Sequence, residues 1–140
     1  MITATATVRF CAAHRLLGHE GACANLHGHN YKVEVTVSND HRLDKVGRVV
    51  DFKEIKRKVG GWIEAYWDHA VILNTCDPLV SELTKDKGKV FEMPRNPTAE
   101  EMALFFFELV VQAFGRDCGV RPVSVRVWET EDSYAEVTSA

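Results

Sequence analysis

At 140 residues, the chain is long enough for one domain that buries about two-thirds of its unfolded surface. The formal net charge of -3 gives no general case for a nucleic-acid or anionic membrane partner, although it is compatible with a small anionic ligand in a local basic pocket. No stretch approaches the roughly 20 apolar residues of a membrane span, and the N-terminus lacks a charged-then-apolar signal pattern. We therefore expect a cytoplasmic protein with a single domain over residues 1–140.

Two stretches alternate between apolar and polar side chains, which is typical of strands with one buried face. The apolar positions of residues 2–14 are Ile2, Ala4, Ala6, Val8, Phe10 and Ala12. The apolar positions of residues 27–38 are Tyr31, Val33, Val35 and Val37. His14 continues the first series, and His27 and His29 precede the second. All three imidazoles are therefore expected on the inward side of two strands joined by one loop.

Helical spacing and capping residues predict two long helices. Asp51 opens the first helix and Glu54 completes a capping-box pattern, and this helix should end near residue 68. The second helix begins at Thr98, where Glu101 again completes a capping box, and it stops at Gly115. The apolar stripe of the first helix consists of Phe52, Ile55, Val59, Trp62, Ile63 and Tyr66.

The remaining elements are shorter. Residues 79–83 are expected to form a single helical turn, and residues 90–93 a short strand. Two further strands are predicted over residues 123–128 and 134–138. The order of the main elements, ββααββ, indicates an α+β protein with a four-stranded antiparallel sheet and two helices on one face. Association into a larger barrel is one way to cover the other face.

The segment 23–29 carries one thiol and two imidazoles, and His14 stands a short way upstream. Residues two apart on a strand point to the same side, so His27 and His29 can act together. Three neutral imidazoles with one open position form the catalytic type of zinc site. The three histidines are accordingly the predicted metal ligands, and the alternative is a set of unrelated core and surface histidines.

Cys23 lies in the loop before the second strand, where it can serve as a nucleophile or a general base. The alternatives are an ordinary loop thiol or a fourth zinc ligand. The other cysteines, Cys11, Cys76 and Cys118, have irregular spacing and are expected to be small, partly buried apolar residues.

Two further groups have chemical potential. Asp68 and His69 are adjacent and could serve one site at a helix end. Alternatively, the helix dipole simply favours a histidine at the C-terminal end of the helix. Glu129 follows three alternating valines on the inward side, which is costly for a carboxylate unless it is paired. It either binds a planar, N–H-rich ligand through two parallel hydrogen bonds or already lies in solvent at the strand end.

Together these residues resemble the 6-pyruvoyl-tetrahydropterin synthase family, and within it the bacterial 6-carboxy-tetrahydropterin synthases of queuosine biosynthesis. The matching segments span nearly the whole chain and are F-C-A-A-H-R-L at 10–16, C-x-x-x-H-G-H at 23–29 with Asn30 and Tyr31, V-D-F at 50–52, D-H at 68–69 with L-N at 73–74, N-P-T-A-E at 96–100, and E-T at 129–130. The three-residue gap between Cys23 and His27 resembles the bacterial carboxy-pterin type. Position 24 is Ala, whereas members that make hydroxymethyl-dihydropterin for folate carry Glu.

The resemblance implies a tunnelling fold, in which three subunits close their sheets into a barrel, two trimers stack, and active sites lie at subunit interfaces. It implies one zinc ion per subunit, held by His14, His27 and His29. Cys23 matches the proton-abstracting residue of the family, and His69 with Asp68 matches its relay partners. The remaining matches are Glu129, which corresponds to the carboxylate that anchors the pterin, and Thr98, which lies where family members contact it.

The implied substrate is 7,8-dihydroneopterin triphosphate. The carboxy-pterin branch eliminates triphosphate and cleaves the side chain to release acetaldehyde, whereas the pyruvoyl branch retains the side chain. Outside the family, a zinc hydrolase and a non-catalytic pterin- or metal-binding module are the alternatives. The chain departs from the family pattern at Cys11, where a small or hydroxyl residue is commoner, and in a longer segment over residues 75–93. The triphosphate-binding residues stay unassigned.

Overall fold

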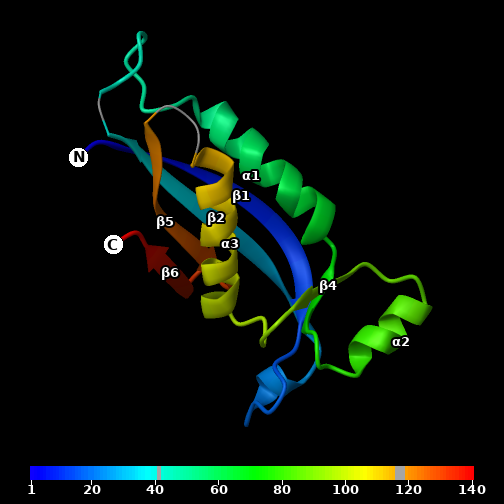
Figure 1. The fold of residues 1–140 in the computed structure, drawn as a ribbon. Helices are drawn as coiled ribbons and strands as arrows, with labels where there is room; N and C mark the ends of the chain where they lie inside the picture. The colour runs from blue at the N-terminus through cyan, green and yellow to red at the C-terminus, as the bar shows by residue number, and fades with distance from the viewer. Residues whose placement is uncertain (41, 116–118) are drawn as a thin grey trace.

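A computed structural model describes residues 1–40, 42–115 and 119–140, so Cys118 lies outside the described residues. One twisted sheet carries helices on one of its faces (Figure 1). The strands of the described chain are β1 (Thr3–His14), β2 (His27–Asn39), β3 (Val71–Asn74), β4 (Val90–Met93), β5 (Val120–Trp128) and β6 (Tyr134–Thr138). Its helices are α1 (Phe52–Tyr66), α2 (Leu79–Lys85) and α3 (Ala99–Phe114), with a 3₁₀ turn at Ala22–Ala24.

The sheet has six strands over the described ranges, in the order β4-β3-β1-β2-β5-β6, so the expectation of four strands was wrong. The expectation of a purely antiparallel sheet was also wrong, because β3 runs parallel to β1 and β4 runs parallel to β3. The short strand predicted over residues 90–93 is confirmed as β4. Only β3 was not predicted, because its four residues are too few to show an alternating pattern. The segment between β3 and β4, expected to form one helical turn, contains the seven-residue helix α2.

The pairing of β1 with β2 confirms the inward side predicted for both strands. The buried residues on this side are Ala4, Ala6, Phe10, Ala12 and His14 from β1, and Tyr31, Val33, Val35 and Val37 from β2. The antiparallel register sets His14 directly opposite His27, and Ala12 opposite His29. Cross-strand neighbours on one face are in side-chain contact. This register brings the three imidazoles together at one end of the sheet.

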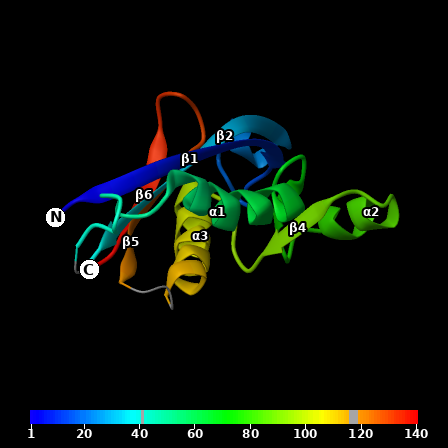
Figure 2. The same ribbon diagram turned by 90° about the horizontal axis from the view of Figure 1, so that it is seen from above.

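Helices α1 and α3 both cover the inward face of the sheet, as the view from above shows (Figure 2). Both helices begin at the predicted caps: Asp51 accepts a hydrogen bond from Lys53 N, and the Thr98 hydroxyl accepts one from Glu101 N. The predicted stripe of α1 is buried only at its centre. Its terminal members, Phe52 and Tyr66, are 56% and 50% exposed, so the buried part of the helix is shorter than the apolar stripe in the sequence.

The opposite face of the sheet, called the open face below, carries the polar positions of β1 and β2. Thr5 and Thr36 share a hydrogen bond there, and Arg9 lies directly opposite Lys32. Neither α1 nor α3 covers this face (Figure 2). Within the described residues, no helix is long and apolar enough to cross a membrane.

Candidate metal centre and active site

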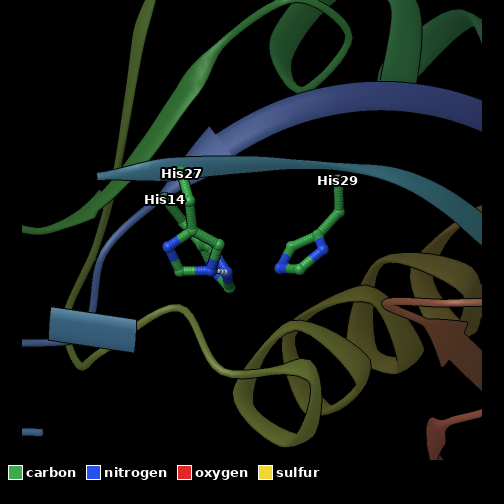
Figure 3. Close-up of side chains that lie close together, drawn as sticks. All are labelled: His14, His27 and His29. Atoms are coloured by element: carbon green, nitrogen blue, oxygen red, sulfur yellow. Dashed lines mark hydrogen bonds between the residues drawn. The ribbon is translucent and has the colours of Figure 1, made fainter. Parts of the chain in front are cut away.

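His14, His27 and His29 converge on one point below the ends of β1 and β2 (Figure 3). Their ring centroids lie 4.6 Å apart for His14 and His27, 4.8 Å for His27 and His29, and 5.1 Å for His14 and His29. Each ring offers one nitrogen, and the three nitrogens lie within 4.8 Å of one another. This arrangement could hold a metal ion, and the alternative of unrelated histidines does not apply.

Backbone carbonyls orient two of these rings. His14 Nδ1 lies 2.8 Å from Pro97 O, and His27 Nδ1 lies 2.6 Å from Asn25 O. A carbonyl oxygen can only accept a hydrogen bond, so each Nδ1 carries the proton and each Nε2 presents its lone pair. The two Nε2 atoms are 3.1 Å apart. A cation bound by both atoms relieves the repulsion between neutral imidazoles, so this donor set fits a metal ion.

His29 completes the set. Its Nε2 atom is buried and makes no hydrogen bond within the described residues. Burial lowers the pKa of His14 and of His29, which favours the neutral, metal-binding form of both rings, although the nearby Glu129 carboxylate opposes this effect. An imidazole nitrogen that makes no hydrogen bond, lies near two other imidazoles and has the Glu129 carboxylate 3.3 Å away is best explained as a metal ligand.

Glu129 lies just beyond the end of β5, on the same side as the histidines. Its Oε1 atom is 3.3 Å from His29 Nε2, and its side chain is 26% exposed. The carboxylate therefore lies beside the histidine cluster, whereas the strand pattern predicted only that it shares the inward side with the valines. Burial raises the pKa of the Tyr31 hydroxyl, and the Glu129 carboxylate adds to this shift.

A segment before α3 fixes His14, and the sequence pattern did not predict this role. The Asn96 side chain accepts a hydrogen bond from Leu17 N at 3.1 Å and donates one to Leu17 O at 2.8 Å. The carbonyl that orients His14 belongs to the next residue, Pro97. The N-P-T-A-E motif was the available signal, but its contact with β1 spans about 80 residues and leaves no local trace.

Arg15 also holds the end of β1. Its guanidinium forms two hydrogen bonds with Asp77, at 2.7 Å and 2.5 Å, and the Asp77 side chain is fully buried. The Arg15 hydrogen bond holds the pKa of Asp77 below its usual range, although burial opposes it. This pair ties the residue after His14 to the loop that follows β3.

Asp68 and His69 do not join the histidine cluster within one chain. Asp68 Oδ1 accepts a hydrogen bond from Cys11 N, and Cys11 belongs to the open face. His69 Nδ1 lies 3.0 Å from Asp68 Oδ2, and the His69 side chain is 77% exposed. Burial would raise the pKa of Asp68, but the hydrogen bonds from Cys11 and His69 hold it below its usual value.

The other two predicted residues have clear places. Cys23 is a half-buried free thiol in the 3₁₀ turn before β2, outside the group of three converging imidazoles. Thr98 caps α3, and this structural role accounts for its hydroxyl. The structure thus brings Glu129 to the histidines, places Asp68 with His69 on the open face, and gives Thr98 a helix-capping contact.

The family model described as 6-pyruvoyl tetrahydropterin synthase matches residues 3–140. The chain belongs to this family. A Rickettsia typhi relative described as 6-carboxy-5,6,7,8-tetrahydropterin synthase is 34% identical over 139 residues, covering 98% of this chain and all of that protein. A Haemophilus influenzae relative with the same description is 38% identical over 133 residues, covering 91% and 92%.

A solved structure gives the fold of the family. The 6-pyruvoyl tetrahydropterin synthase of Plasmodium vivax superposes with a TM-score of 0.73 at 21% identity, covering 99% of each chain. At this identity the likeness concerns the fold alone, and it supports the predicted tunnelling fold. The family membership predicted from the motifs is therefore confirmed.

Proposed function

We propose that the protein is a zinc-dependent lyase that converts 7,8-dihydroneopterin triphosphate to 6-carboxy-5,6,7,8-tetrahydropterin, with release of acetaldehyde and triphosphate. The observation that carries the proposal is the convergence of three imidazoles with Glu129, which lies 3.3 Å from His29. The descriptions of the Rickettsia and Haemophilus relatives support the carboxy-pterin product. The reaction would serve queuosine biosynthesis in the cytoplasm, where the thiols would stay reduced.

Zinc is the metal that this donor set favours, because three neutral imidazoles with an open position are typical of catalytic zinc. Bound there, it would polarise the substrate's side-chain hydroxyls and acidify the adjacent C–H bonds. Glu129 would bind the aminopyrimidinone edge of the pterin through two parallel hydrogen bonds. Its closeness to His29 would hold the pterin beside the metal, and Thr98 is a further candidate for pterin contact.

Cys23 would abstract the proton from the substrate side chain, and His69, oriented by Asp68, would act as its relay partner. Within one chain His69 lines the cavity on the open face together with Arg9 and Lys32, whereas His14, His27 and His29 belong to the inward side of β1 and β2. We therefore infer that one subunit supplies the metal and Glu129, and that a neighbouring subunit supplies Asp68 and His69. A trimer, or a dimer of trimers, that joins the edges of its sheets would bring these halves together.

Arg9 and Lys32 are our candidates for the triphosphate. They are directly opposite each other across β1 and β2, and two like charges in such positions repel. The described residues form no hydrogen bond or ion pair with Arg9, whereas Lys32 lies 4.3 Å from the centre of the Trp128 ring and 3.9 Å from Glu34. Both cations line a cavity of about 750 Å³ that also contains His69. A polyanion in this cavity would relieve their repulsion.

The test is incubation of the zinc-loaded protein with 7,8-dihydroneopterin triphosphate, followed by assays for triphosphate and acetaldehyde. We expect both products in equal amounts. Triphosphate release without acetaldehyde would instead assign the pyruvoyl reaction. Binding without turnover would assign a non-catalytic pterin-binding module.

A cysteine variant separates the lyase from a zinc hydrolase. Cys23→Ala should abolish turnover of the lyase, because the proton-abstracting thiol is lost. A hydrolase that activates water would keep most of its activity in this variant. Cys76→Ala is the matched control, since Cys76 is an exposed free thiol in a different part of the chain.

A further inference from the structure

A second group of metal-ligand side chains lies on the open face, apart from the three histidines. It consists of Cys11, Asp68 and His69, whose candidate ligand atoms all lie within 4.8 Å of one another. Cys11 Sγ is 3.9 Å from Asp68 Oδ1, and His69 Nδ1 is 3.0 Å from Asp68 Oδ2. With metal–ligand bonds of about 2.0–2.3 Å, neighbouring atoms of a tetrahedral zinc site lie about 3.3–3.8 Å apart. Small shifts of the side chains would bring the three atoms to these separations.

The backbone already holds this group together. Cys11 N donates a hydrogen bond to Asp68 Oδ1, and His69 N donates one to Cys11 O at 2.7 Å. His69 has a φ of 60°, a left-handed conformation that is uncommon for a residue other than glycine. Residue 11 therefore fixes both of its partners through main-chain contacts, which a change of its side chain would leave in place. Only the third donor atom, the thiol, depends on residue 11 being Cys.

The group is also accessible. Cys11, Asp68 and His69 line the same cavity of about 750 Å³ on the open face. The His69 side chain is 77% exposed, so an ion can reach it without any rearrangement of the fold. Arg9 and Lys32 line this cavity too and would repel a cation. Binding would therefore need the negative charge of both the Cys11 thiolate and the Asp68 carboxylate.

We propose that Cys11, Asp68 and His69 form a second site for a divalent cation that accepts sulfur, nitrogen and oxygen ligands, with zinc as the best match. The thiolate and the carboxylate balance the charge of the ion, and a fourth position stays open. An ion at this site occupies His69 Nδ1 and the Asp68 carboxylate. The consequence for activity rests on the proposed function: zinc in excess of the histidine site would block the relay pair and inhibit turnover.

The test uses cobalt(II), because cobalt bound by a thiolate shows a near-ultraviolet charge-transfer band that cobalt bound only by imidazoles lacks. The metal-free full chain is titrated with cobalt without substrate, so the result does not depend on the proposed function. Wild type and the matched control Cys76→Ser should bind two equivalents and show the band. Cys11→Ser should bind one equivalent without the band, whereas His27→Ala should bind one equivalent with it.

Cys23→Ser identifies the thiolate that produces the band. If the band disappears in Cys23→Ser and survives in Cys11→Ser, the cobalt–sulfur bond is formed by Cys23 at the histidine site, and the proposal is wrong. A single equivalent in wild type, with no band, overturns it as well. Alkylation of the wild-type protein gives a measurement that needs no variant. Zinc should slow the alkylation of Cys11 and leave the alkylation rate of Cys76 unchanged. Equal rates of Cys11 alkylation with and without zinc would refute the site.

Inhibition provides the functional readout. Above one equivalent, added zinc should lower the activity of wild type, and Cys11→Ser should need at least about tenfold more zinc for the same loss because it lacks one ligand. The loss is expressed relative to the activity of each protein at one equivalent of zinc, because Cys11 lines the cavity proposed for the triphosphate. Equal zinc sensitivity in both proteins would contradict the proposed link between this site and the relay pair.

Discussion

Replacement of Asn96 by Ala tests whether the segment before α3 holds the metal centre in shape. The side chain of Asn96 makes two hydrogen bonds to the backbone of Leu17 and accepts a third from Asn74 at 3.3 Å. At about 1 kcal/mol for each of the two shorter bonds and less for the third, the variant should lose about 2–3 kcal/mol of unfolding free energy. Denaturant unfolding of the metal-free protein measures this loss.

Asn96→Ala should also weaken metal binding. Pro97 O orients the His14 ring, and the Asn96 side chain holds this segment in place through its hydrogen bond to Leu17. Loss of an orienting partner typically lowers metal affinity by about 10–100-fold. Competition with a chromophoric zinc chelator measures the affinity. Asn74→Ala is the matched control, because it leaves both contacts to Leu17 and removes the 3.3 Å bond, together with the hydrogen bond that Asn74 Oδ1 accepts from Cys76 N. If Asn96→Ala loses stability while its zinc affinity stays within twofold of the control, the orienting role is wrong.

Three further outcomes are expected. Asp77→Asn should destabilise the protein by about 2–4 kcal/mol at neutral pH, because it leaves the partly buried Arg15 without its charged partner. The pKa of Asp77 is lower in the folded than in the unfolded protein, so this stabilisation exists above the unfolded pKa and is lost as pH falls through the folded pKa. The unfolding free energies of wild type and Asp77→Asn should therefore converge in acid. A difference that stays constant with pH would contradict the role of the Asp77 charge. Thr98→Ala should cost about 1 kcal/mol of unfolding free energy through loss of the α3 cap, and Thr98→Asn should restore this stability. A raised KM in both variants would reveal contact between Thr98 and the pterin, whereas an unchanged KM in both would reject it. Glu129→Gln should raise the KM for the pterin at least about tenfold, because a charge-assisted hydrogen-bond pair is lost, while its zinc content stays equal to that of wild type. An unchanged KM would reject the anchor.

Several parts of the site followed from the sequence because they depend on local periodicity. A strand alternates its side chains, so the position of His14 in the first apolar series and of His27 and His29 before the second determined that all three face inward. Glu129 was placed by the same rule. The caps at Asp51 and Thr98 were readable because a capping side chain bonds to residues two or three positions away.

Only the tertiary structure decided how distant segments meet. It set the register that places His14 opposite His27, and it brought Asn96 to Leu17 across about 80 residues. It also added β3 and paired it in parallel with β1 and with β4. It also placed Asp68 and His69 beside Cys11 on the open face. The sequence could not predict this placement, because the residues at a helix end carry no pattern that specifies a face of the sheet. Periodicity determines which side of its own element a residue occupies, whereas pairing and packing between elements depend on contacts that leave no local pattern.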